Sequence, residues 1–207
     1  MKKIFYLMII LVFSNVVYCQ TTSYTFVQEL QNQGIDTICV YYDYCGFCSS
    51  PNICEELDST YVFWKNQGKN FVKRMHSCYD FSTVEIDTVT FWNTFFENKE
   101  TIKTEEIKSF TYSIDTIRRR KKTIVSESSL SVDDAGYQSY NMIINNDITD
   151  FYAGTIEFEQ KYEFNDKNYT NINYLYNNNL KGKIVFDEIK NLVMKLEKEQ
   201  KFILQKS

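Results

Sequence analysis

The feature that most constrains the fold is a pair of strand-forming runs around one short turn. Residues 61–65 and 70–75 are rich in β-branched and aromatic side chains, and Asn66-Gln67-Gly68 separates them. Gly68 supplies the positive φ angle that a tight turn needs, so the sequence predicts a β-hairpin in which residues 64 and 71 face each other. The chain is therefore expected to build an antiparallel sheet.

Apolar spacing around this hairpin predicts one α+β domain. Helices are expected over residues 23–33 and 88–97, the second one capped by Asp87 or Thr88. A last helix carries an apolar stripe, with Glu197 and Lys201 expected to pair on its other side. We expect this C-terminal amphipathic helix and one or two others to cover one face of the sheet. The stripe consists of Val185, Ile189, Leu192, Val193 and Leu196. The other strands are predicted at residues 35–43, 84–87, 110–117, 122–128, 137–144 and 155–164.

Two segments near the C-terminus have an ambiguous pattern. Residues 165–179 contain seven asparagines, which predicts a polar loop. The alternative is an asparagine ladder in a β-solenoid, but no repeat period accompanies it. The tail Phe202-Ile203-Leu204 is expected to pack back on the domain or to touch a partner.

The N-terminus has the pattern of an export signal. Lys2 and Lys3 precede ten apolar residues, which is too short a run for a spanning helix. Residues 1–19 are therefore predicted to be a signal peptide, cleaved between Cys19 and Gln20, and residues 20–207 a single exported domain. The alternative is lipidation of Cys19 as in bacterial lipoproteins, but Tyr18 is bulky for that position. We expect a bacterial protein that is periplasmic, on the outer surface or secreted.

Composition excludes several classes of function. Cleavage leaves 188 residues with 21 basic and 27 acidic side chains, a net charge of −6, which argues against nucleic-acid binding. The sole histidine, His76, excludes any metal site or catalytic centre that needs two. The six glycines are isolated, so no phosphate-binding loop is recognised. The sequence indicates no cofactor, no metal and no membrane span after cleavage.

The mature chain keeps five cysteines. Cys39 lies in a predicted strand and is expected to be a buried, inert thiol. The others are disulfide candidates, because an exported chain meets an oxidising compartment. The hairpin register brings residue 57 opposite residue 78, which favours a Cys54–Cys78 bridge worth about 3 kcal/mol and a local Cys45–Cys48 bridge. A four-cysteine zinc site is the alternative, but the spacing does not form two CxxC pairs.

Cys45-Gly46-Phe47-Cys48 resembles the redox site of thioredoxin-like proteins over about a dozen residues. The resemblance implies a nucleophilic Cys45 and a resolving Cys48. That family carries its CxxC at the start of a helix, whereas Pro51 here disrupts such a helix. The family also places a cis-proline opposite the cysteine pair, and Pro51 is the only proline in the chain. We therefore favour structural disulfides and keep thiol–disulfide exchange as the alternative.

Two further features are candidates for function. His76 and Cys78 lie two residues apart on a predicted strand, so a Cys–His dyad is one interpretation and a surface histidine is the other. A run of five basic residues suits an anionic polymer, a lipid headgroup or a partner's acidic face, or else lies at a solvated strand end. The run consists of Arg118, Arg119, Arg120, Lys121 and Lys122.

These patterns predict a non-enzymatic exported protein with a binding or structural role. No catalytic constellation is visible, and the high aromatic content suits a contact surface. Its partner is expected to be a macromolecule in the envelope or outside the cell. The alternative function is thiol–disulfide oxidoreductase activity at Cys45 and Cys48.

Overall fold

The structure is a computed structural model that describes residues 23–44, 59–76, 78–119, 122–132 and 136–205. These residues form one α+β domain around a six-stranded sheet in the order β4-β3-β2-β1-β7-β8, and every neighbouring pair is antiparallel. The predicted fold class is confirmed. The strands of this sheet are β1 (Thr37–Tyr44), β2 (Ser59–Asn66), β3 (Lys69–Met75), β4 (Val84–Ile86), β7 (Tyr137–Ile144) and β8 (Asp147–Gly154).

The β2–β3 hairpin has the predicted turn and register. Gln67 and Gly68 form a two-residue loop with φ angles of 50° and 79°, the positive values that a tight hairpin turn requires. Trp64 lies opposite Phe71, and their rings stack with centroids 5.5 Å apart. The short strand β4 pairs with the outer side of β3, as expected of an edge piece.

A second hairpin, β7–β8, was missed from the sequence. Asn145 and Asn146 form its turn with φ angles of 50° and 65°, which asparagine tolerates better than most residues. β7 has the predicted bounds, but the predicted strand over 155–164 is wrong. After the end of β8, that segment contains the short 3-10 helix η2 (Ile156–Phe158) and strand β9 (Lys161–Phe164). Strand β9 pairs with β10 (Lys167–Thr170).

Helices α2 (Phe91–Ile102) and α4 (Lys181–Lys198) pack on one face of the sheet. The stripe of α4 is buried as predicted, with Leu192 half-buried at its border. The predicted helix over 88–97 begins later, because Thr90 is the residue before its first turn and makes no side-chain cap. The predicted caps at Asp87 and Thr88 are therefore wrong.

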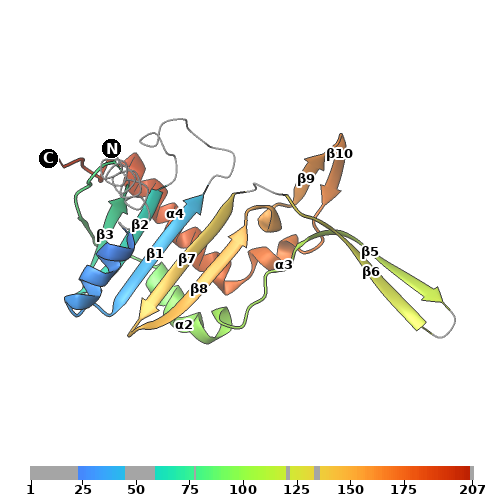
Figure 1. The fold of residues 1–207 in the computed structure, drawn as a ribbon, viewed down its shortest axis with the longest axis horizontal. Coiled ribbons are helices and arrows are strands. Elements are labelled where there is room, and N and C mark those ends of the chain that lie inside the picture. Colours follow the sequence, from blue (N-terminus) through green and yellow to red (C-terminus); the bar gives the residue numbers. More distant parts are fainter. Residues whose placement is uncertain (1–22, 45–58, 77, 120–121, 133–135, 206–207) are drawn as a thin grey trace, which may run out of the picture.

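A third helix, over residues 23–32, lies on the opposite face of the sheet (Figure 1). Its Val27 and Leu30 pack with Val62 and Trp64 in a second hydrophobic cluster. The expectation that the C-terminal helix and one or two others cover one face is confirmed by α4 and α2, and the helix over residues 23–32 adds cover on the other face near β1, β2 and β3. This leaves the outer face of β7 and β8 uncovered.

Two groups of contacts join strands of the sheet to the elements around it. Asp147, in the first position of β8, accepts hydrogen bonds from Lys103 Nζ at 2.8 Å and forms an ion pair with Lys99 Nζ at 2.7 Å, both from α2 and the residue after it. Hydrogen bonds from Lys103 and then Lys99 lower the pKa of Asp147 to about 2. At the C-terminus, Phe202 packs on Tyr61 with ring centroids 5.5 Å apart, so the tail packs back on the domain.

Candidate functional site

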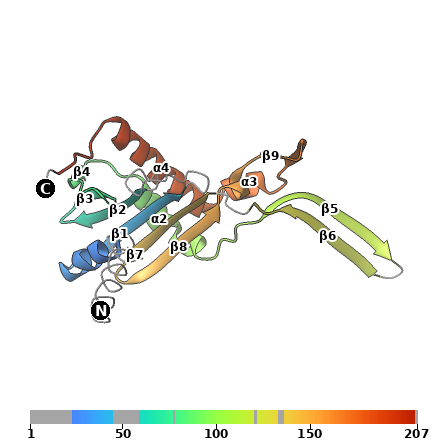
Figure 2. The ribbon, with the colours of Figure 1, turned by 45° about the horizontal axis from the view of Figure 1, so that its top comes forward.

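Strands β5 (Phe110–Arg119) and β6 (Lys122–Leu130) leave the body of the domain as a separate two-stranded ribbon. Figures 1 and 2 show this ribbon reaching away from the six-stranded sheet, and we call residues 110–130 the arm. Its ladder runs from Phe110 opposite Leu130 to Arg119 opposite Lys122, with a bulge between Thr111 and Ser113. Ten residues at about 3.4 Å each make the arm roughly 30 Å long.

The predicted basic run lies at the far end of the arm. Arg118 and Arg119 end β5 and Lys122 begins β6, while Arg120 and Lys121 fall outside the described residues. Residues 110–130 contain five basic and two acidic residues in a chain whose net charge is −4. The arm therefore concentrates positive charge at its tip, away from an acidic body.

Aromatic contacts seat the base of the arm. Phe110 is fully buried and meets the ring of Tyr162 in β9 at 6.5 Å. Tyr112, at the bulge, meets Tyr169 in β10 edge-to-face at 4.7 Å. The β9–β10 hairpin thus supports the first residues of the arm, and Figure 1 shows it beside the arm's base.

A buried asparagine holds the chain just before the arm. Asn177, in helix α3 (Tyr174–Asn178), is fully buried. Its Nδ2 donates to Lys108 O at 2.7 Å and to Glu157 O at 2.9 Å, and its Oδ1 accepts from Lys108 N at 3.0 Å. One side chain therefore satisfies both main-chain groups of Lys108 and ties them to the segment after β8.

Two more asparagines extend this arrangement into the arm. Asn173 Nδ2 donates to Ser109 O at 3.0 Å and to Thr111 Oγ1 at 3.2 Å. Asn171 is buried, and its Nδ2 donates to Glu157 O at 3.0 Å while its Oδ1 accepts from Asn173 N at 2.9 Å. We call Asn171, Asn173 and Asn177 the asparagine brace.

The brace corrects the prediction of a polar loop over residues 165–179. Within the described structure this segment forms β10 and α3, and neither a solenoid nor an asparagine ladder is present. The amide side chain carries both donors and an acceptor, so a buried asparagine can pair main-chain groups that no strand or helix pairs. Sequence alone missed these residues because buried and solvated asparagines look the same in a polar segment.

The structure describes only part of the predicted cysteine cluster. Cys45, Cys48 and Cys54 lie outside the described residues, as do Cys19 and Gln20, so the disulfide, redox and cleavage predictions stay predictions. Cys39 is a free, fully buried thiol, as predicted, and burial raises its pKa.

His76 and Cys78 are close, and the hydrogen bond between them is made by the main chain of Cys78. His76 Nδ1 accepts a hydrogen bond from the Cys78 backbone N–H at 3.0 Å, and the His76 ring packs on Tyr79 at 4.9 Å. Cys78 lies in the exposed segment after β3. These contacts orient the ring through the backbone and give no support to a Cys–His dyad.

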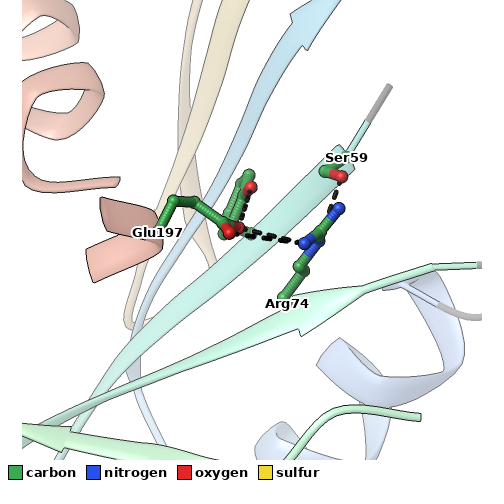
Figure 3. Close-up of polar contacts among 4 residues, drawn as sticks. Ser59, Arg74 and Glu197 are labelled. Atoms are coloured by element: carbon green, nitrogen blue, oxygen red, sulfur yellow. Dashed lines mark hydrogen bonds and ion pairs between the residues drawn. The ribbon is translucent and has the colours of Figure 1, made fainter. Parts of the chain in front are cut away.

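A polar cluster joins α4 to the β2–β3 hairpin (Figure 3). Glu197 accepts a hydrogen bond from Tyr61 Oη at 2.7 Å and pairs with Arg74 Nη1 at 3.2 Å, and Arg74 Nε donates to Ser59 Oγ at 3.2 Å. Burial, with the Glu197 hydrogen bond next, raises the pKa of Tyr61 well above its ordinary value. The expected Glu197–Lys201 pair is wrong, because α4 ends at Lys198 and Glu197 turns toward the sheet. The cluster's groups satisfy one another, which indicates a structural link.

No protein-family model, curated protein or solved structure matches this chain. Among the described residues, no group of three or more His, Cys, Asp or Glu side chains is placed to hold a metal ion. In the part of the chain that the structure describes, no helix has both the length and the apolar character needed to cross a membrane. The arm and the surface around it are therefore the features of the described structure that bear on function.

Proposed function

We propose that the chain is a non-enzymatic binding protein that acts after export, in the periplasm, at the cell surface or outside the cell. It contacts a negatively charged macromolecular partner with the tip of the arm, and disulfides among the clustered cysteines stabilise it. The observation that carries the proposal is the arm itself, with the basic residues Arg118, Arg119 and Lys122 at the end of its strands farthest from the sheet.

The arm contributes little to the packing of the body, which supports a role outside the fold. Neither of the two hydrophobic clusters includes an arm residue among the described side chains. An isolated two-stranded ribbon is marginally stable in water, and its outer edges present unpaired backbone groups. The ribbon adds little to the packing of the body, yet three asparagines hold its base. We therefore expect the ribbon to serve in contact with a partner.

The charge distribution supports an anionic partner. Arg118, Arg119 and Lys122 lie at the tip, whereas the chain as a whole has a net charge of −4. The Debye length is about 8 Å at physiological ionic strength, so a tip roughly 30 Å from the arm's base is screened from the acidic body. The tip therefore attracts an anionic surface that the body repels only weakly.

The test is binding of the mature domain to two polyanions, polyglutamate for an acidic protein face and phosphatidylglycerol vesicles for lipid headgroups. We expect binding to at least one of them that weakens as salt rises, and loss of that binding when Arg118→Glu and Lys122→Glu are combined. The preferred probe identifies the class of partner. The matched control combines Lys161→Glu and Lys167→Glu, which changes the net charge equally at exposed positions of the β9–β10 hairpin.

The control is expected to bind as the unchanged protein does. Equal binding by the arm variant, or equal loss in both variants, would show that net charge and not the arm governs the interaction. Failure of both probes to bind would remove the electrostatic basis of the proposal.

A further inference from the structure

The outer face of β7 and β8 is exposed at one end of the sheet. Side chains of β8 alternate, with Thr149, Phe151 and Ala153 buried and Asp150 and Tyr152 exposed. Tyr152 keeps 66% of its surface in contact with solvent. The helix over residues 23–32 packs on the other end of this face, so no described element covers these side chains.

Three tyrosines and three polar residues line a hollow of about 370 Å³ on this face. The strand register places Tyr42, Ser139 and Tyr152 in one row across β1, β7 and β8, and Asn141 opposite Asp150 in the next row. Tyr137 completes the lining, and its ring lies 5.3 Å from that of Tyr152 at an interplanar angle of 36°. The two rings thus form a tilted aromatic platform beside amide, hydroxyl and carboxylate groups.

A second hollow, of about 280 Å³, shares this aromatic pair at the base of the arm. Tyr137 and Tyr152 line both hollows, which therefore lie side by side on the two sides of this pair, and we call them together the tyrosine groove. The second hollow is also lined by Ser109, Ser129, Ser131 and Glu157. It is the more polar half of the groove, whereas the first half exposes the tyrosines and Asp150.

Glu157 places a second carboxylate at the groove. Its Oε2 is buried and accepts no hydrogen bond from any described residue. A side chain at Gly154 would bring its Cβ to 2.5 Å from this oxygen, so the glycine is what lets the carboxylate lie against the end of β8. Glu157 as a whole is only half-buried and lines the second hollow, so its carboxylate can accept a hydrogen bond from a donor bound there.

The arrangement of these groups favours a polyhydroxylated ligand. Asp150 and Glu157 line opposite halves of the groove, with the tyrosine pair between them, so a single cation cannot meet both. An extended ligand with several hydroxyl groups donates to both carboxylates and exchanges hydrogen bonds with the serines and Asn141. Its apolar ring faces pack on the tyrosines, whose rings combine an apolar body with a polar tip.

We infer that the tyrosine groove is a binding site for an oligosaccharide. The site is separate from the tip of the arm and does not rest on the proposed function. A groove lined by aromatic rings with a few polar groups, and hollows at the lower end of the about 300–1,000 Å³ typical of ligand sites, fit a chain of sugar rings lying along the surface.

The test measures binding of the mature domain to a panel of oligosaccharides built from glucose, galactose, mannose or N-acetylglucosamine, by calorimetry. We expect at least one of them to bind, and Tyr152→Ala to weaken that binding by about 30-fold, as for a central aromatic contact. Asp150→Asn and Glu157→Gln are expected to weaken it as well. The matched control is Tyr24→Ala, because Tyr24 is 64% exposed on the helix over residues 23–32 and lies outside the groove.

Several outcomes overturn the inference. They are the absence of binding by every oligosaccharide, equal binding by Tyr152→Ala and the unchanged protein, and equal loss in Tyr24→Ala. Spermidine serves as a cationic probe, and groove-dependent binding of spermidine without any oligosaccharide assigns the groove to amines instead. The arm variant with Arg118→Glu and Lys122→Glu is expected to bind the oligosaccharide normally, which separates this inference from the proposed function.

Discussion

Removing the Asn177 side chain tests whether the asparagine brace holds the arm to the body. Asn177→Ala deletes two donated hydrogen bonds, to Lys108 O and Glu157 O, and one accepted from Lys108 N. Each such bond contributes about 0.5–1.5 kcal/mol, and a polar group left buried without a partner costs about 1–3 kcal/mol. Because Lys108 is exposed and Glu157 is half-buried, water can form hydrogen bonds with some of the main-chain groups that lose the Asn177 side chain. We therefore expect a loss of about 2–4 kcal/mol in the free energy of unfolding.

Urea unfolding of the mature domain at neutral pH measures this loss. Asn179→Ala is the matched control, because Asn179 is exposed and its side chain makes only a local bond to Leu175 O at 2.6 Å. A change within about 0.5 kcal/mol is expected there, as for an ordinary surface position. Hydrogen exchange supplies a second readout: in Asn177→Ala the amides near Ser109 and Thr111 should exchange faster than those of β2.

The role assigned to Asn177 fails if Asn177→Ala and Asn179→Ala lose equal stability. It also fails if Asn177→Ala loses less than about 1 kcal/mol, the net value of a single hydrogen bond. Either result would mean that Asn177 does not hold the base of the arm, and that the bonds of Asn173 and the aromatic contacts of Phe110 and Tyr112 suffice.

Three further predictions concern pH, packing and the cysteines. The pKa of Asp147 is about 2 against an ordinary 3.8, so its stabilising ion pairs persist above pH 4 and are lost as pH falls toward 2. The difference in unfolding free energy between the unchanged protein and Asp147→Asn should therefore be constant from pH 5 to 7 and shrink below pH 4, and a constant difference down to pH 2 would contradict the assignment. Tyr61→Phe removes the bond to Glu197 and should cost about 1–2 kcal/mol by urea unfolding, whereas an unchanged midpoint would mean that the bond adds nothing. Cys45→Ser should lower the melting temperature without changing the rate at which the mature domain reduces a disulfide substrate, and a lost reductase rate would favour the oxidoreductase alternative.

Local chemistry explains which parts of the fold were predictable from the sequence. The β2–β3 hairpin was predicted with its register because Gly68 and the flanking runs specify it within fifteen residues. The β7–β8 hairpin has an equally local signal in Asn145-Asn146, but the strand prediction stopped at Ile144 and did not include the second strand of this hairpin. The side of the sheet on which each helix packs is decided by contacts between distant segments, so the sequence did not show that the helix over residues 23–32 packs on the face opposite α2 and α4.

The basic run of the arm and the tyrosine groove also differ in how far they could be predicted from the sequence. The basic run is contiguous, so its residues were identified from the sequence, although the length of the arm that carries it was not. The tyrosine groove joins Tyr42 with Tyr137 and Tyr152, which meet only because β1 pairs with β7 and β7 with β8. The asparagine brace likewise bonds residues 62 to 69 positions away in the chain. No local pattern specifies such pairings, and so neither site was visible before the topology was known.

The claim that the arm contacts the partner is tested most directly by locating the contact on the backbone. Amide hydrogen exchange of the mature domain is compared with and without the polyanion that it binds, either polyglutamate or phosphatidylglycerol vesicles. We predict slower exchange that is concentrated in β5 and β6 near residues 118–122 and small in the six-stranded sheet. Protection confined to the body, with the arm unchanged, would contradict the account.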